Sequence, residues 1–165
     1  IQLANMAAAV SNRGWWIRPH LVRSIDGTPN PNPEFSKVHR TTIDPQNFEV
    51  IIAGMNDVFE SGTARASRLE GLLMAGKTGT AQNPHGQDHS IFTAFAPLDK
   101  PQIALAIIVE NGYWGSRWAA PIASLMMESY LNDTITRPDL YRRMVEGSLT
   151  GEYRVNQVET ELPPY

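Results

Sequence analysis

The stretch "LLMAGKTGTAQNP" (residues 72–84) places a lysine and two threonines inside an otherwise apolar run. Its composition predicts a β-strand from about Leu72 to Gln82, and similar apolar runs predict strands over residues 90–96 and 102–110. Only short polar segments separate these three runs. Neighbouring strands should therefore be antiparallel, because a parallel crossover needs about a dozen residues or more.

Helical patterns flank the three predicted strands. Leu3, Met6, Ala7 and Val10 recur at helical spacing before Gly14. A second helix is predicted to begin near Asp44 and Pro45 and to end near Gly62. A third is predicted over residues 118–131, and its sheet-facing side is expected to comprise Ile122, Leu125, Met126 and Leu131.

Both faces of the later strands are apolar, so the sheet is expected to be covered on both sides. The predicted fold class is therefore α+β: an antiparallel sheet with helices on both faces. Before the second helix, "WWIRPHLVRSIDG" (residues 15–27) predicts one further strand, with Ile17, Leu21 and Ile25 in alternation, followed by a proline-rich loop. A short helix is a possibility within residues 137–149, and the end of the chain reads as a loose tail.

Bulk composition excludes several classes of function. The formal net charge of the 165 residues is -3, which gives no electrostatic basis for binding nucleic acid. There are no cysteines, so disulfides and thiolate chemistry are excluded. No apolar run approaches the roughly 18 residues that span a bilayer. The sequence opens without methionine on a helical pattern, and we expect it to be part of a longer protein.

The residues Lys77 to Thr80 form a cationic, hydroxyl-rich strip on the first predicted strand. A fixed positive charge and two hydroxyls are suited to binding a carboxylate, because charge-assisted hydrogen bonds are strong. Gly79 leaves room for a ligand backbone, and the Thr80 N–H is a candidate oxyanion donor. Alternation places Thr78 and Thr80 on one face and Lys77 on the other. A bare Lys-Thr-Gly tripeptide by itself favours a simpler interpretation, a strand-end lysine with its ammonium in water.

The longer motif "MAGKTGTAQNPHGQDHSIFTAFAP" (residues 74–97) resembles the third signature of the penicillin-binding proteins, serine transpeptidases of peptidoglycan synthesis. Similar segments are "IQLANMAAAVSNRG", "SGTARASRLEG", "FAPLDKPQIALAIIVENGYWG" and "WAAPIASLMMESYL". The resemblance covers residues 1–131 and is greatest to the class B, elongation-type group called penicillin-binding protein 2. It departs at Ile91, where that pattern is expected to have tryptophan.

The resemblance implies a partial penicillin-binding-protein or serine β-lactamase-like transpeptidase fold and assigns roles to the strip. Lys77 and Thr80 would be catalytic, Lys77 by its charge and Thr80 through its N–H. Thr78, Gly79 and Thr80 would bind substrate. The family also uses a Ser-x-x-Lys nucleophile motif and a Ser-x-Asn motif, and no serine of this sequence begins either one. We therefore expect a D,D-transpeptidase whose nucleophile lies outside this chain, so that the chain alone is inactive.

The resemblance also implies the setting of the protein. It predicts a transpeptidase portion at residues 1–131, a tail at 132–165, and a place at the periplasmic face of the bacterial inner membrane through an upstream anchor. The expected partners are peptidoglycan stem peptides, β-lactams, the missing N-terminal part and an elongation-complex glycosyltransferase, with no cofactor, metal or nucleic acid.

The sequence also allows other functions for this chain. A serine β-lactamase-like hydrolase shares the Lys-Thr-Gly strand, although "KTGTAQ" lacks the second glycine common there. A non-catalytic β-lactam sensor or cell-wall-binding module is another alternative. His85, Asp88 and His89 lie close enough in sequence to ligate a metal, but a polar loop at the mouth of the cleft is the simpler interpretation.

Overall fold

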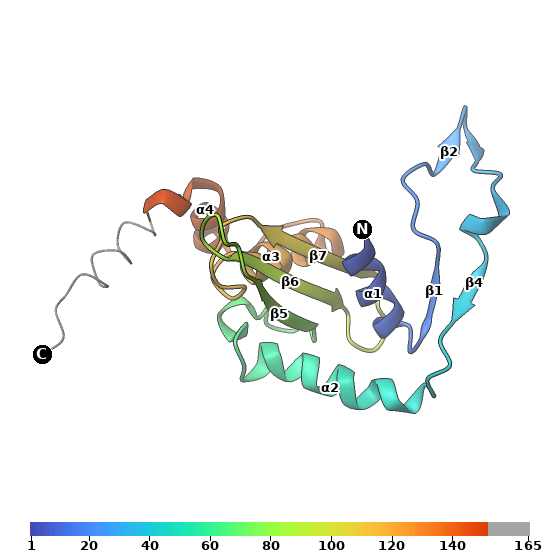
Figure 1. The fold of residues 1–165 in the computed structure, drawn as a ribbon, viewed down its shortest axis with the longest axis horizontal. Coiled ribbons are helices and arrows are strands. Elements are labelled where there is room, and N and C mark those ends of the chain that lie inside the picture. Colours follow the sequence, from blue (N-terminus) through green and yellow to red (C-terminus); the bar gives the residue numbers. More distant parts are fainter. Residues whose placement is uncertain (152–165) are drawn as a thin grey trace, which may run out of the picture.

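A three-stranded sheet forms the centre of the protein in the computed structural model, which describes residues 1–151 (Figure 1). Its strands are β5 (Ala75–Ala81), β6 (His89–Ala96) and β7 (Ile103–Val109), in the order β5-β6-β7 with antiparallel pairing throughout. All three predicted strands and their antiparallel arrangement are confirmed. Within the described residues, β5 is an edge strand whose outer side has no strand beside it.

The register between β5 and β6 fixes which side chains share a face. Thr78 is paired with Phe92, Thr80 with Ser90, and Lys77 with Thr93. Since side chains alternate along a strand, Thr78 and Thr80 lie on one face and Lys77 on the other. The alternation expected from the sequence is confirmed.

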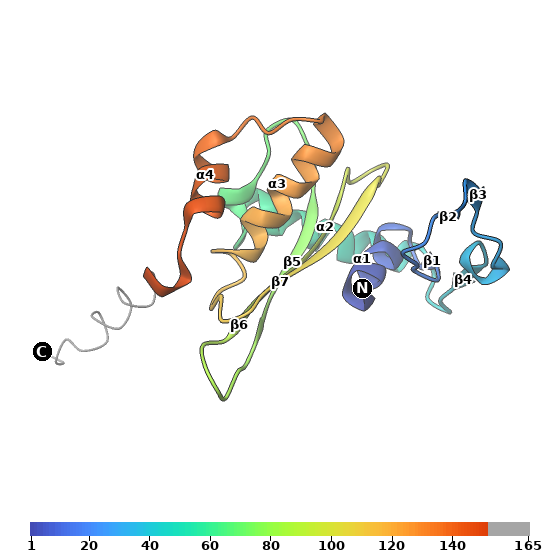
Figure 2. The ribbon, with the colours of Figure 1, turned by 90° about the horizontal axis from the view of Figure 1, so that it is seen from above.

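Helices cover both faces of this sheet, as predicted (Figure 2). On one face, α3 (Ala119–Asn132) packs on β6 and β7. On the other, α1 (Gln2–Ser11) packs on β6 and β7, while α2 (Gln46–Glu60) packs on β5. Each side has its own apolar core, the first containing Phe59, Phe92, Leu105 and Met127 and the second Phe48, Ile52, Ala75 and Phe95.

The sheet-facing side of α3 differs from the prediction. Alanines and Met127 line the core, whereas Met126 is 48% exposed. Ile122, Leu125 and Met126 instead line a groove between α3 and α4 (Pro138–Glu146). Only Leu131 of the predicted set packs against the core cluster. Small alanine side chains allow the helix backbone to approach the sheet closely, so the larger apolar residues turn toward the next helix.

The strand predicted over residues 15–27 is largely wrong. Only β1 (Trp15–Ile17) and β2 (Ser24–Ile25) form, and they pair with β4 (Val38–Arg40) and β3 (Thr28–Pro29) respectively. Pro19 lacks a backbone N–H and cannot continue a ladder. The resulting arm, which includes a short 3-10 helix, η1 (Pro33–Phe35), extends away from the sheet (Figure 1), and Leu21 on it is 91% exposed.

The segment after α3 folds back onto the domain. Asp133 has a left-handed backbone and ends α3, and α4 follows after five residues and packs against α3. The helix considered possible from the sequence is therefore present. None of the helices that the structure describes is both long and apolar enough to span a bilayer.

Candidate active site

The strip Lys77–Thr80 lies on β5, which is an edge strand of the sheet within the described residues. Lys77 and Thr80 are exposed, whereas Thr78 and Gly79 are half-buried. The start of the same strand, Ala75 and Gly76, is buried between the helices. The strand thus runs from the core to the surface, and its polar residues begin where burial ends.

Lys77 reaches the edge of the sheet through its long side chain. Its Nζ donates a hydrogen bond to the backbone carbonyl of Thr78 at 2.8 Å. The ammonium group therefore lies beside the strip, although its Cβ points to the opposite face from the two threonines. Backbone groups of residues two apart on a strand point to the same edge. We infer from this contact that the Thr80 N–H points to the open edge as well.

Thr78 is contacted by two segments distant in sequence. Its Oγ1 lies 3.4 Å from Oγ1 of Thr63, which follows the end of α2. On the other side, Gly115 packs so closely that an added Cβ would lie 2.6 Å from the Ile91 carbonyl oxygen and 3.2 Å from the Thr78 Cβ. Neither contact was predicted, because Thr63 and Gly115 occur in polar turns without a pattern that identifies them.

Hydrogen bonds hold the turn that carries Gly115 on the sheet. Ser90, wholly buried opposite Thr80, donates to the Trp114 carbonyl at 3.0 Å and accepts from the Ala119 N–H at 3.2 Å. The Tyr113 N–H donates to the Asp88 carbonyl at 2.8 Å. The turn between β7 and α3 is therefore anchored to the site from both ends.

Residues 1–128 match the family model described as the penicillin binding protein transpeptidase domain. The chain belongs to this family. The sequence-based identification of residues 1–131 as similar to a class B penicillin-binding protein is thereby confirmed, and relatives named MrdA, PbpA and PBP2 are among its matches. Ile91, the residue that departs from the expected pattern, pairs with Gly79 in the register of β5 and β6.

Relatives with assigned names cover most of this chain. Peptidoglycan D,D-transpeptidase MrdA of Acinetobacter baumannii is 34% identical over 150 residues, which cover 79% of this chain and 22% of the relative. Peptidoglycan D,D-transpeptidase PbpA of Mycolicibacterium smegmatis is 31% identical over 150 residues, covering 81% of this chain and 29% of the relative. The chain thus spans less than a third of the length of either relative.

Solved structures give the same fold. Pseudomonas aeruginosa PBP2, solved in complex with WCK 5153, is 44% identical with a TM-score of 0.69, over 79% of this chain and 29% of that one. Penicillin-binding protein A of M. tuberculosis, solved as a ceftriaxone acyl-enzyme complex, is 30% identical with a TM-score of 0.66, over 78% of this chain and 31% of that one. The predicted transpeptidase fold is therefore confirmed.

Ser90, the serine paired with Thr80 across the sheet, is not arranged as a nucleophile in this penicillin-binding-protein domain. Ser90 uses its hydroxyl for the two structural hydrogen bonds described above and is buried. No serine in the sequence precedes a lysine by three residues. The described residues therefore contain the strip without an activated hydroxyl beside it.

Polar side chains of the hairpin between β5 and β6 bond within the hairpin and to Asn111, which follows β7. Nδ1 of His89 accepts a hydrogen bond from the Asn111 N–H at 3.0 Å, and Asp88 Oδ1 accepts one from the Asn83 N–H at 3.2 Å. Asn83 also donates to Asn111 at 3.0 Å. Between residues 1 and 151, no group of three or more histidines and carboxylates is arranged to hold a metal ion. These side chains tie the hairpin to the turn beside Gly115.

Proposed function

We propose that this chain forms one wall of the active site of a peptidoglycan D,D-transpeptidase that cross-links stem peptides and is acylated by β-lactams. The observation that carries the proposal is the Lys77–Thr80 strip, whose strand has no strand beside its outer edge within the described residues. Relatives named peptidoglycan D,D-transpeptidases and a neighbour solved as an acyl-enzyme support it.

In this proposal, Thr78 and Thr80 bind the terminal carboxylate of a stem peptide, or the carboxylate of a β-lactam that imitates it. Lys77 supplies the positive charge that favours this anion. Gly79 lets the ligand backbone lie against the strand. As an acyl group is transferred, the Thr80 N–H donates to the oxygen that becomes negative.

The nucleophilic serine is proposed to come from another part of the same protein. That serine would attack the penultimate D-alanine carbonyl, forming an ester and releasing the terminal D-alanine, and an acceptor amine would then displace the serine oxygen. The chain described here would contribute binding and electrostatic stabilisation but no covalent bond. The division into residues 1–131 and a tail at 132–165 stays part of this proposal.

The roles of the threonines are tested by acylation with a fluorescent penicillin, using the protein that contains this chain together with its serine-bearing portion. We expect Thr78→Val or Thr80→Val to slow acylation at least about tenfold, because each removes a hydrogen bond to a charged group worth roughly 1.5–3 kcal/mol. Thr28→Val, on the distant arm, is the control. Acylation at the wild-type rate in both site variants would refute the assignment.

The same experiment distinguishes the alternatives of a hydrolase and a sensor. A transpeptidase retains the penicilloyl group as a stable adduct, whereas a β-lactamase releases it rapidly. A non-catalytic sensor would bind or retain β-lactam without cross-linking stem peptides. Rapid turnover of free penicillin would therefore contradict the proposal in favour of a serine β-lactamase-like enzyme.

The cellular setting is also proposed. We place the protein at the periplasmic face of the inner membrane, held by an upstream anchor, in a complex with the elongation machinery and its glycosyltransferase. Helicobacter pylori PBP2, 25% identical with a TM-score of 0.60, has been solved in complex with MreC. Co-purification with MreC and a glycosyltransferase from solubilised membranes tests this; absence of both would contradict it.

A further inference from the structure

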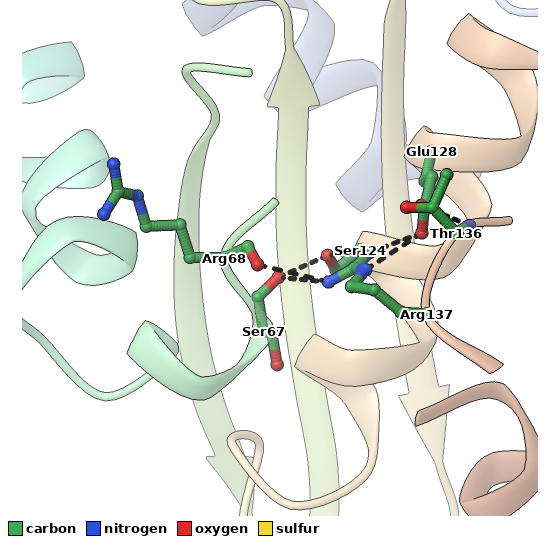
Figure 3. Close-up of polar contacts among 6 residues, drawn as sticks. All are labelled: Ser67, Arg68, Ser124, Glu128, Thr136 and Arg137. Carbon is green, nitrogen blue, oxygen red and sulfur yellow. Dashed lines mark hydrogen bonds and ion pairs between the residues drawn. The ribbon is translucent and has the colours of Figure 1, made fainter. Parts of the chain in front are cut away.

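A carboxylate near the C-terminal end of α3 is buried completely. Glu128 is 0% exposed. It accepts hydrogen bonds from the Thr136 N–H at 2.8 Å, from the Thr136 hydroxyl at 2.6 Å and from Nε of Arg137 at 2.9 Å (Figure 3). The Arg137 guanidinium, with its side chain 19% exposed, completes an ion pair with Glu128 at 2.9 Å.

The same guanidinium continues to the turn that leads into β5. Nη1 of Arg137 donates to the carbonyl of Ser67 at 3.0 Å and to that of Arg68 at 3.3 Å (Figure 3). Nη2 donates to Ser124 Oγ at 2.9 Å, and that hydroxyl donates to the Ser67 carbonyl in turn. One side chain thus joins α3 to the short 3-10 helix η2 (Arg65–Ser67).

The carboxylate is charged at neutral pH despite its burial. Burial by itself raises the pKa of Glu128, but the hydrogen bonds from Thr136 and Arg137 and the positive charge of Arg137 together bring that pKa below its ordinary value. A buried ion pair contributes little to stability compared with apolar residues of the same volume. What this pair does supply is a fixed geometry, since a guanidinium binds its acceptors in a rigid, planar arrangement.

The segment that Arg137 holds leads directly to the candidate active site. Thr63, four residues before Ser67, has its hydroxyl 3.4 Å from that of Thr78. After Ser67, the chain passes through buried Leu69 and Met74 and then enters β5. The turn held by Arg137 is therefore connected to the strip on β5 both through the Thr63 hydroxyl and through the covalent chain.

We propose that Arg137, oriented by Glu128, is a positioning residue for the Lys77–Thr80 strip and acts through the Ser67 carbonyl and Thr63. This rests on the proposed function in so far as the strip binds substrate. Thr136 and Arg137 follow residue 128, where the match to the family model ends. The segment after α3 therefore takes part in shaping the candidate site.

Amide hydrogen exchange on the 165-residue chain tests the positioning role and does not require enzymatic activity. Arg137→Lys keeps the charge but removes the planar fork, and Arg142→Lys changes an exposed arginine on α4 that pairs only with Asp139 among the described contacts. For Arg137→Lys we expect amides of residues 61–80 to exchange about tenfold faster, the factor for one lost charge-assisted hydrogen bond. Peptides from β7 should exchange as in the wild type, and Arg142→Lys should change nothing.

Two results would overturn the proposal. One is unchanged exchange in residues 61–80, and the other is an equal increase over all three strands, which would show a general loss of stability instead of a local role. Thr136→Val removes only one hydroxyl donor to Glu128 and should give the same local pattern with a smaller increase. If Arg137→Lys does not fold, the exchange pattern of Thr136→Val tests the positioning role in its place.

A kinetic measurement separates this inference from the proposed function. In the serine-bearing protein, Arg137→Lys is expected to raise the dissociation constant for penicillin about threefold to tenfold, while the acylation step changes less than about twofold. The contact from Thr63 reaches the hydroxyl of Thr78, which binds the carboxylate, and does not reach Thr80, whose N–H serves the acylation step. An unchanged dissociation constant would contradict the positioning role. A wild-type protein that is never acylated would contradict the proposed function, and the exchange pattern would still decide the role of Arg137.

Discussion

Two glycines on β5, three residues apart, are expected to respond in opposite ways to the same substitution. A Cβ added at Gly76 would lie 2.5 Å from Cζ of Phe92 and 3.0 Å from Cε2 of Phe59. Both rings are 0% exposed and pack edge to face with centroids 5.5 Å apart, so neither has space to move. A Cβ added at Gly79 would meet nothing closer than 3.4 Å, which is ordinary contact with Ile91.

The expected magnitudes follow from these distances. The 2.5 Å approach to Phe92 puts overpacking at Gly76→Ala in the upper part of its usual range, about 2–3 kcal/mol. Removing a strand glycine returns about 0.5–1 kcal/mol, so the net loss is about 1–2.5 kcal/mol. For a domain of this length each kcal/mol shifts Tm by roughly 2–4 °C, so the melting temperature should fall by about 2–10 °C. Gly79→Ala has only the favourable contribution and should melt at the wild-type temperature or slightly above it.

Thermal unfolding followed by circular dichroism on the two variants checks the stability difference. Acylation of the serine-bearing protein then checks the function of Gly79: we expect Gly79→Ala to be folded but slow to react, because its methyl group occupies the strip. A Gly79→Ala variant that loses as much stability as Gly76→Ala would refute the packing argument. A stable variant with wild-type acylation would refute the ligand-approach role of Gly79.

Three further substitutions concern buried polar side chains. Glu128→Gln should cost about 1–3 kcal/mol at neutral pH in urea unfolding. Because the folded pKa of Glu128 is below its ordinary value of 4.5, the stabilisation is complete above that value and is lost as pH falls through the folded pKa. The stability deficit of the variant should therefore shrink as the pH falls below 4.5 and through the folded pKa. A deficit that stays constant would contradict this expectation. Ser67→Ala should be neutral or stabilising, since Ser67 Oγ is buried without a hydrogen-bond partner in the described residues. Ser124→Ala should cost about 1 kcal/mol because its hydroxyl joins Arg137 to the Ser67 carbonyl, and equal effects of the two alanines would contradict this assignment.

The sheet and the face assignment of the strip were predictable because both depend on local pattern. Short connections force antiparallel neighbours, and a period of two determines that Lys77 and Thr78 point to opposite faces. The family resemblance depended on the extended motif around Lys77. These features follow from residues that are adjacent in sequence, so the sequence was sufficient for them.

The contacts that surround the strip depend on long-range packing and were not predictable. Arg137 and Ser67 are 70 residues apart. Ser67 lies in a polar segment between predicted elements, and Arg137 begins the stretch in which a short helix was only a possibility. The α3 helix was assigned the wrong face because its large apolar residues face α4, and small alanines face the sheet. We predicted too long a strand in the arm because we gave more weight to the apolar pattern of Ile17, Leu21 and Ile25 than to Pro19. Pro19 lacks the backbone N–H that a continuous strand needs.

If this chain provides a substrate-binding wall and its nucleophile lies elsewhere, penicillin should react only with the longer protein. Intact-mass spectrometry after incubation with penicillin distinguishes the cases, on the 165-residue chain and on the protein that includes the serine-bearing portion. We expect no change in mass for the chain alone and the addition of one penicilloyl group to the longer protein. A penicilloyl adduct on the 165-residue chain, or none on the longer protein, would contradict this expectation.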